Sequence, residues 1–312
     1  MLADKNQIYD MVIIGGGPGG YTAALYAARA GMQVLVVEKL SAGGQMALTH
    51  MIDNYPGFHE GIDGFELGYR MQQGAERFGA RTLQAEVRSV ELLSNPKRIV
   101  TSSGDLFGRT VIIATGANPK PLGLAGEREL TGRGVHYCAA CDGMFYRGKT
   151  VVVVGGGNSA AADALLLSRV AKKVILVHRR DSLRAEKAVS AALEQAENVE
   201  FRWNSVAEEI LHDQRVHGLR LRNVADGAVS DVECQGIFVS IGRKSASELF
   251  REQVALDEAG YIVAGESTQT SIPGVYAVGD VRTKAVRQIV TAVADGAVAV
   301  HMAELWMADQ QA

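Results

Sequence analysis

The chain has 312 residues, of which 47% are hydrophobic and only 6 are proline, so it is long enough for two packed domains and too apolar for a disordered protein. The formal net charge of −3 offers no basic surface for nucleic acid or for an anionic membrane, so we expect neither partner.

The composition also favours a cytoplasmic location. Residues 1–5 lack the basic and then apolar layout of a secretory signal. The longest apolar runs, such as residues 151–154, have the length of a strand and are too short to cross a bilayer. With 3 cysteines the chain has an odd number and no disulfide framework typical of secreted proteins, which fits a reducing cytosol.

The first expected element is a buried strand over residues 9–14, an uninterrupted apolar run of the kind that covered parallel strands show. It leads into the turn Gly15-Gly16-Gly17-Pro18-Gly19-Gly20, and then into an alanine-rich helix over residues 21–30. A second strand is expected over residues 34–38. The G-x-G-x-x-G pattern alone is weak in a chain with 35 glycines, but this strand–turn–helix context is that of a dinucleotide-binding loop.

An acidic residue, Glu38, ends the second expected strand. A carboxylate there can accept hydrogen bonds from the ribose hydroxyls of a dinucleotide, while the pyrophosphate lies at the N-terminus of the helix. The alternative is a chance glycine turn. The first unit therefore indicates a dinucleotide whose ribose carries free hydroxyls.

Further along the chain, Cys138 and Cys141 stand three positions apart in the run Cys138-Ala139-Ala140-Cys141-Asp142-Gly143. Two thiols at this spacing can close to a small disulfide and reopen, which is the chemistry of two-electron exchange with another disulfide. Half of a zinc site and a pair of inert buried thiols are the alternatives. Zinc would need further ligands at matching spacing, and the sequence has no second C-x-x-C and no H-x(3–5)-H pair.

The strand–glycine–helix pattern then returns. An apolar strand over residues 149–154 leads into Gly155-Gly156-Gly157-Asn158-Ser159-Ala160, a helix rich in alanine and leucine, and a strand over residues 174–177. His178 lies as far beyond Gly155 as Glu38 lies beyond Gly15, and Arg179, Arg180 and Arg184 follow it. A guanidinium can bind a 2′-phosphate that a carboxylate would repel, so the second unit indicates NADP(H). A solvated basic surface patch is the alternative.

Two dinucleotide folds, one of which carries a dithiol, indicate a flavin next to a nicotinamide. A nicotinamide delivers hydride, whereas thiols exchange electrons at sulfur, and a flavin connects the two chemistries.

Taken together, these motifs resemble the low-molecular-weight thioredoxin reductases of the bacterial type, over almost the whole length. No single motif is decisive, but their order and spacing are highly specific. The motifs that carry the resemblance are Gly15-x-Gly17-x-x-Gly20, Gly43-Gly44-Gln45, Asn54-Tyr55-Pro56-Gly57, Ala114-Thr115-Gly116, the cysteine run, Gly155-Gly156-Gly157-Asn158-Ser159-Ala160, His178-Arg179-Arg180-Asp181 with Arg184, Gly279-Asp280-Val281 and Arg287-Gln288.

The resemblance implies an α/β protein with two Rossmann-like dinucleotide-binding domains, the second inserted into the first. Residues 1–116 and 243–312 would form a discontinuous FAD domain, and residues 117–242 an NADPH domain that carries the cysteines. The segments 117–121 and 242–247 would connect the two domains and act as hinges for a rotation between them. An apolar-faced helix is expected over residues 288–307. The resemblance also implies a homodimer and a thioredoxin or thioredoxin-like partner.

The resemblance further implies the site residues. Cys141 would face the flavin, Cys138 would attack the partner's disulfide, and Asp142 would donate and accept the proton. FAD would be bound by Gly15, Gly17, Pro18, Gly20, Glu38, Gly44, Gln45, Asn54, Val87, Ala114, Thr115, Gly116, Gly279, Asp280, Arg287, Gln288 and Ile289. NADPH would be bound by Gly155, Gly157, Asn158, Ser159, Ala160, His178, Arg179, Arg180 and Arg184.

Several alternatives stay open at this stage. Asp142 can instead be a helix cap beside Gly143. His136 can steady a thiolate, although a structural or surface histidine is the commoner outcome. Cys234 is expected to be a buried structural thiol. Two segments depart from the usual pattern of the family. The Ala139-Ala140 pair is expected to change the reduction potential modestly, and the segment 241–246 can change the geometry of the hinge.

Other functions with the same chemistry also stay open. One is the flavoprotein component of an alkyl hydroperoxide reductase system, which usually has an extra N-terminal region and favours NADH. Others are a dithiol oxidase that uses oxygen and a flavoprotein that only senses redox state. The arginines after His178 favour NADPH-dependent reduction of a thioredoxin.

Overall fold

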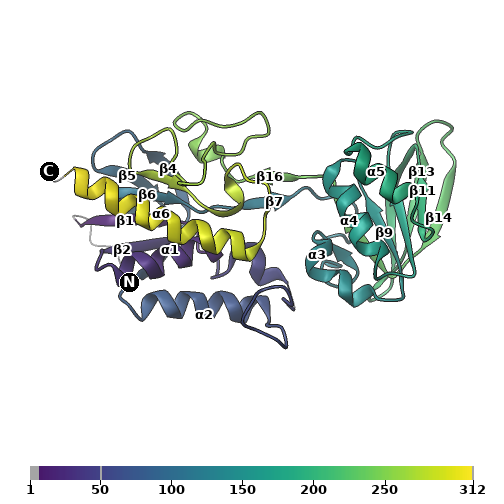
Figure 1. Ribbon diagram of the computed structural model, residues 1–312, viewed down its shortest axis with the longest axis horizontal. Coiled ribbons are helices and arrows are strands. Elements are labelled where there is room, and N and C mark those ends of the chain that lie inside the picture. The colour runs from purple at the N-terminus through teal and green to yellow at the C-terminus, as the bar shows by residue number, and fades with distance from the viewer. Residues whose placement is uncertain (1–6, 50, 311–312) are drawn as a thin grey trace. The chain divides into compact units, whose positions relative to one another are not determined.

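The computed structural model describes residues 7–49 and 51–310 (Figure 1). The chain forms two compact units, which we describe one at a time. The first unit contains the chain up to Asn118 and from Lys244 onward, and the second unit is Pro119–Arg243. The assignment of one cofactor to each unit stays a prediction.

The first unit is built on a mixed sheet with the strand order β3-β2-β1-β6-β5-β4, and a further strand, β17, pairs with β6. Strands β1, β2, β3, β6 and β17 run parallel, whereas β5 pairs antiparallel with both β4 and β6. The strands are β1 (Ile8–Ile14), β2 (Val34–Glu38), β3 (Arg81–Gln84), β4 (Val87–Glu91), β5 (Lys97–Thr101), β6 (Gly104–Ile113) and β17 (Val275–Ala277).

Both faces of this sheet are covered, as the uninterrupted apolar run of β1 requires. Met11 and Ile13 face a core that includes alanines of α1 (Pro18–Arg29) and of α6 (Ile289–Asp309). These two helices lie side by side in Figure 1, and a Cβ on Gly296 of α6 would lie only 2.4 Å from the carbonyl oxygen of Gly19 in α1. Val12 and Ile14 face the opposite core, to which the segment between β16 and β17 contributes Phe250. The unit also contains α2 (Gly64–Glu76), η1 (Gly44–Leu48), η3 (Glu248–Phe250) and η4 (Gly279–Val281).

The second unit repeats this design with an all-parallel sheet in the order β11-β10-β9-β15-β8. Its strands are β8 (Val135–His136), β9 (Thr150–Val154), β10 (Lys173–Val177), β11 (Val199–Arg202) and β15 (Gly236–Val239). One face packs on α3 (Ala139–Asp142), η2 (Gly143–Tyr146), α4 (Asn158–Ser168) and α5 (Lys187–Glu194), and the other packs on an antiparallel layer of β12 (Ser205–His212), β13 (Val216–Asn223) and β14 (Val229–Glu233).

The predicted fold class is confirmed: the chain is an α/β protein with two Rossmann-like domains, and the second is inserted into the first. The run β1–loop–α1–β2 in the first unit matches the run β9–loop–α4–β10 in the second, and both pairs of strands are parallel. The predicted strand over residues 34–38 has the observed bounds of β2, and the other elements of both runs differ from the prediction by a few residues.

The two connecting segments are extended strands. Strand β7 (Ala117–Pro119) forms a two-stranded sheet with β16 (Arg243–Ser245). Hydrogen bonds from Ala246 N to Gly116 O and from Lys120 N to Gly242 O, each 3.0 Å long, flank this pair. Proline at the end of β7 fits a short strand better than a helix.

Helix α6 confirms the predicted helix over residues 288–307. By length and composition alone, this 21-residue helix with a mean hydropathy of 1.3 is long and apolar enough to cross a membrane, although we expected no such segment. Core helices of globular proteins pass the same test. Here Ala299, Val300 and Ala303 are buried beside α1, and Asp295 is buried in an ion-pair cluster, so packing within the unit accounts for the buried third of the helix.

Candidate active site

The two predicted redox cysteines are joined as a disulfide, with their Cα atoms 5.3 Å apart. Both residues are half-buried; Cys138 directly precedes the short helix α3 and Cys141 lies within it, two residues of chain separating β8 from α3. Cys138 has an extended backbone and is the N-cap of this helix, where its Sγ accepts a hydrogen bond of 3.2 Å from Cys141 N. The pair therefore lies at the edge of a rigid parallel sheet, and the helix turn sets the sulfur spacing.

Asp142 is the last residue of α3, but its side chain does not cap a helix. The cap alternative is therefore wrong, because Cys138 Sγ caps α3 and the Asp142 carboxylate points elsewhere. Its Oδ2 lies 2.9 Å from Nδ1 of His136, and Nε2 of the same ring lies 2.6 Å from the hydroxyl of Tyr146. His136 is buried and not on the surface, and both of its ring nitrogens have partners.

The first glycine loop has the geometry of a dinucleotide cradle. Gly15 has a φ of +108°, and a Cβ there would lie 2.5 Å from the Ala114 carbonyl oxygen. A Cβ on Gly20 would lie 2.0 Å from the Gly15 carbonyl oxygen, so the turn closes only with glycine at both positions. Gly17, the N-cap of α1, has open space around its Cα and is followed by Pro18, which leaves room for a phosphate at the helix N-terminus.

Glu38 is held at the end of β2, facing this loop. Its Oε2 accepts a hydrogen bond of 2.6 Å from Gly16 N, and its Oε1 accepts one of 2.9 Å from Leu40 N. The carboxylate is thus oriented by backbone donors and still has lone pairs for ribose hydroxyls. This placement agrees with the role predicted for Glu38.

Other predicted residues of the first unit gather at the carboxyl ends of its parallel strands, where ligands of open α/β sheets bind. The residues that directly follow β6 are Ala114, Thr115 and Gly116, and those that follow β17 include Gly279 and Asp280 in η4. Three more residues lie on neighbouring segments: Gly44 and Gln45 in η1, and Ile289 at the start of α6. Val87 opens β4, an antiparallel edge strand.

Two side-chain hydrogen bonds connect segments of this region that are distant in sequence. The Gln45 amide donates to Asn118 at 2.9 Å, and the Asn54 amide donates to the Gln288 side chain at 3.2 Å. Gln288 is also the N-cap of α6, with a capping box to Thr291. Three predicted residues, Gln45, Asn54 and Gln288, therefore take part in two separate hydrogen bonds between distant segments.

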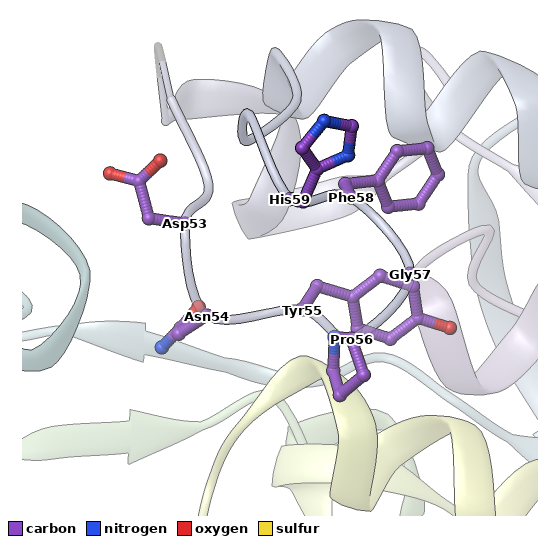
Figure 2. Close-up of a pocket in the computed structure, with 7 residues that line it drawn as sticks. All are labelled: Asp53, Asn54, Tyr55, Pro56, Gly57, Phe58 and His59. Atoms are coloured by element: carbon purple, nitrogen blue, oxygen red, sulfur yellow. The ribbon is translucent and has the colours of Figure 1, made fainter.

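Asn54 belongs to a loop that forms a pocket of its own. Figure 2 shows the pocket, with the rings of Phe58 and His59 on one stretch of the loop and Tyr55 and Pro56 on another. Tyr55 and Phe58 stack with their ring centroids 6.2 Å apart. The resemblance pointed to residues 54–57, but nothing in the sequence pointed to Phe58 or His59.

Arg287 and Asp295 show how η4 and its surroundings are fixed. The Arg287 guanidinium lies 4.0 Å from the ring centroid of Tyr261, and its buried Nε has no hydrogen-bond partner within the described part of the chain. Asp295 binds Gly279 N at 2.8 Å and pairs with buried Arg282 and Lys284, each at 2.7 Å. Burial alone would raise the pKa of Asp295, but these hydrogen bonds lower it below its ordinary value. Sequence reasoning missed Asp295, because no motif includes it.

The second glycine loop repeats the cradle. Gly155 has a φ of +154°, and a Cβ there would lie 2.4 Å from the Ser240 carbonyl oxygen. Around Gly157, the N-cap of α4, there is again open space. The residues of the first turn of α4 are Asn158, Ser159 and Ala160, and the Asn158 side chain accepts a hydrogen bond of 2.9 Å from Glu186 N.

His178 follows β10 directly and packs against this loop, since a Cβ on Gly156 would lie 2.1 Å from the His178 ring. Its Nε2 is buried without a hydrogen-bond partner among the described residues. Burial lowers the pKa of His178, and the charges of Arg184, Arg180 and Arg179 lower it further. The neutral imidazole has a free nitrogen and lies beside three exposed guanidinium groups. Together these groups form a polar surface that can bind a phosphorylated nucleotide.

Comparison with known proteins places this geometry in context. The family described as pyridine nucleotide-disulphide oxidoreductase matches residues 9–296. A thioredoxin reductase of Mycolicibacterium smegmatis is 43% identical over 310 residues, which cover 99% of this chain and 100% of the relative. One from Listeria monocytogenes is 42% identical, with 98% and 96% covered.

Solved structures agree with these relatives. The thioredoxin reductase of Streptococcus pyogenes superimposes with a TM-score of 0.90 at 41% identity, covering 97% of this chain and 99% of that one. The enzyme from Giardia duodenalis gives the same TM-score at 35% identity, with 97% and 100% covered.

Proposed function

Because the chain belongs to the pyridine nucleotide-disulphide oxidoreductases, and among them to the thioredoxin reductases, we propose that it uses NADPH to reduce the disulfide of a thioredoxin. Membership of this family implies a flavin and a nicotinamide cofactor. The observation that carries the proposal is the Cys138–Cys141 disulfide on the edge of a nucleotide-binding sheet whose loop is lined by arginines. The proposal specifies FAD as the flavin, NADPH as the nicotinamide and a thioredoxin as the protein partner.

The first unit fits FAD. The backbone of the first glycine loop would bind the pyrophosphate, Glu38 would accept the ribose hydroxyls, and the turn Gly279–Asp280 would lie beside the cofactor. Asp295 holds that turn through Gly279 N. The buried, unpartnered Nε of the half-buried Arg287 supports a further polar group at this site.

The second unit fits NADPH. Three exposed guanidinium groups, of Arg179, Arg180 and Arg184, supply the charge-assisted hydrogen bonds that a 2′-phosphate requires. His178 is kept neutral by burial and by these arginines, and it offers its free Nε2 to the bound nucleotide. When both cofactors are bound, the nicotinamide supplies a hydride and the flavin relays its two electrons to the disulfide.

The chain's own residues carry the thiol chemistry. Opening the Cys138–Cys141 bond takes two electrons and one proton and leaves one thiol and one thiolate. The Cys138 thiolate then attacks the partner's disulfide, forms a mixed disulfide and releases one partner thiolate. Attack of Cys141 on Cys138 Sγ restores the internal disulfide and releases the second partner thiolate. Asp142, adjoining Cys141, would give and take back the proton.

A homodimer and a cytoplasmic location are also proposed. Apolar side chains of the first unit support the dimer, since Tyr26 on α1 and Phe65 and Tyr69 on α2 are 46% to 56% exposed. Such side chains are usual at protein interfaces. Sedimentation of the purified protein tests the dimer, and a monomer at micromolar concentration would contradict it.

Absorbance spectroscopy of the purified protein tests the proposed function. We expect a flavin band that is bleached by NADPH and restored by oxidised thioredoxin, with NADH a poor substitute. If the protein is purified without colour, it is reconstituted with FAD before the assay. If the reconstituted protein consumes no NADPH in the presence of thioredoxin, the proposal is wrong.

A further inference from the structure

A buried histidine lies two residues before the redox cysteines. His136 ends β8, and the register of β8 with β15 sets it opposite Phe238. The His136 ring stacks on the Phe238 ring at 5.2 Å with an interplanar angle of 26°. Packing therefore fixes the plane of the imidazole as well as its position.

Both nitrogens of this ring are hydrogen-bonded, one to Asp142 at 2.9 Å and the other to the Tyr146 hydroxyl at 2.6 Å. The Tyr146 ring also packs edge-on against His136 and Phe238, at 5.2 and 5.4 Å. Space for it exists because residue 236 is glycine, since a Cβ there would lie 2.4 Å from the Tyr146 ring. The cluster of His136, Asp142, Tyr146 and Phe238, here the histidine cluster, is thus preformed within the second unit.

The histidine cluster can stay hydrogen-bonded whether or not Asp142 carries a proton. When the carboxylate is ionised, Nδ1–H donates to it and Nε2 accepts from the Tyr146 hydroxyl. When Asp142 is protonated, its O–H donates to Nδ1, and Nε2–H donates to the Tyr146 oxygen. A change of tautomer at His136 connects the two states without breaking a contact.

Tyr146 suits this role because it stays neutral. Burial raises the pKa of its hydroxyl to about 12; Asp142 and Cys234 add to the shift and Arg215 opposes it. The Lys149 ammonium lies 5.4 Å from the Tyr146 ring centroid. Among the described residues, Asp142, Arg215 and Cys234 act electrostatically on Tyr146, and Lys149 contacts its ring.

We propose that His136 is a positioning residue for Asp142: it orients the carboxylate beside the dithiol and, with Tyr146, keeps it hydrogen-bonded in both protonation states. This inference rests on the proposed function, in which Asp142 exchanges a proton with the dithiol. During reduction of the partner, the proton that leaves a Cys thiol is taken by Asp142, while both electrons stay on sulfur and pass to the partner's disulfide.

The test follows thiol–disulfide exchange in the purified protein, with no NADPH and no thioredoxin added. The protein is reduced with dithiothreitol, desalted, and mixed with an aromatic disulfide such as 5,5′-dithiobis(2-nitrobenzoic acid) across a range of pH. The released thiolate is followed by stopped-flow absorbance. The variants are His136→Phe, which keeps an aromatic ring on Phe238 but loses both nitrogens, Tyr146→Phe and Asp142→Asn. His136→Asn serves as the rescue, because its amide can still donate to Asp142.

Loss of a donor disfavours the ionised form of a carboxyl group. We therefore expect His136→Phe to move the midpoint of the pH–rate profile to higher pH and to slow exchange by about tenfold near neutrality. This is less than the roughly 10²- to 10⁴-fold effect of a general acid or base itself, because His136 acts through Asp142. Tyr146→Phe should shift the midpoint less, and His136→Asn should largely restore it. In the Asp142→Asn background, His136→Phe should cause no further shift.

Two results would overturn the inference. One is an unchanged midpoint in His136→Phe, with a loss of rate no larger than that of Leu193→Ala, a truncation in the same core away from the histidine cluster. The other is an equal shift in the presence and absence of the Asp142 carboxylate, because His136 would then act on the thiols directly. Failure of the proposed function is distinguishable, since it appears as missing NADPH- and thioredoxin-dependent turnover in the unchanged protein.

Discussion

The first glycine loop ends against a carboxylate and the second against a neutral imidazole flanked by arginines, although both are built the same way. Gly15 and Gly155 each adopt a positive φ, and a Cβ on either would lie within 2.5 Å of a carbonyl oxygen from a neighbouring strand end. The residue after the loop glycine meets the end of the second strand in both units. Gly16 N donates to Glu38, whereas Gly156 packs on His178.

The comparison separates two kinds of constraint. Close backbone contacts select glycine in both loops, so the glycines identify a nucleotide fold but not the nucleotide. The first loop faces the negative charge of Glu38, whereas arginines follow the neutral His178 at the second loop, and charge decides whether a 2′-phosphate is tolerated. A second difference is that only the second unit carries the dithiol. The predictions below test these differences, from the largest expected effect to the smallest.

Replacing Cys138 with serine removes the chemistry that only the second unit carries. We expect thioredoxin reduction to fall to background, because serine cannot form the mixed disulfide, while NADPH still bleaches the flavin band. Steady-state turnover and anaerobic absorbance titration measure the two effects. The matched control is Cys141→Ser, which should also lose turnover but keep a nucleophile at position 138. Residual turnover in Cys138→Ser would contradict the assignment of Cys138 as the attacking thiol.

Replacing Arg179 and Arg180 with glutamine, in the second unit, tests the charge difference between the two loops. A hydrogen bond to a charged group contributes about 1.5–3 kcal/mol, and solvent screening reduces the contribution of exposed arginines such as these. We therefore expect the two together to contribute about as much as one unscreened bond, so that the KM for NADPH rises by about 10- to 100-fold. The KM for NADH should change little, and the preference between the two coenzymes should narrow. The control is Arg202→Gln, since Arg202 pairs with Glu200 in β11 and has no proposed contact with the nucleotide. An unchanged preference would mean that the basic cluster is only a solvated surface.

Replacing Glu38 with glutamine tests the same difference from the first unit. The amide oxygen can still accept from Gly16 N, but the charge that favours ribose hydroxyls is lost, and we expect FAD to bind about tenfold more weakly. Fluorescence of released flavin on dilution measures the dissociation constant. The KM for NADPH should stay as in the unchanged protein. If flavin affinity stays the same while NADPH binding weakens, the two loops have been assigned to the wrong cofactors.

Local patterns predicted the parts of the fold that depend on nearby residues. The apolar run of β2, the two glycine turns and the helices that follow them were found because period, turn chemistry and capping are local signals. The antiparallel layer β12–β14 was not predicted. Its strands alternate less clearly, and their register includes bulges.

The histidine cluster shows why part of the site could not be predicted. Asp142 was placed near the cysteines, but its partner was unknown, because His136 and Phe238 come together only through the pairing of β8 with β15. Asp295 was missed for the same reason, since it reaches Gly279 only after α6 packs beneath η4. Contacts between residues distant in sequence depend on the assembled sheet, and no spacing rule describes them.

Cys234 gives the smallest expected effect and compares a third thiol with the dithiol inside the same unit. It is fully buried and unpaired, and burial raises the pKa of its thiol to about 12. Since the thiolate is the reactive form, we expect iodoacetamide at neutral pH to label the reduced Cys138–Cys141 pair and leave Cys234 unmodified in the folded protein, as peptide mass spectrometry can show.

Cys234→Ala should cost about 1 kcal/mol of unfolding free energy through lost packing and leave turnover unchanged. Fast labelling of Cys234, or a loss of turnover in Cys234→Ala comparable to that of Cys138→Ser, would mean that the third thiol takes part in the exchange.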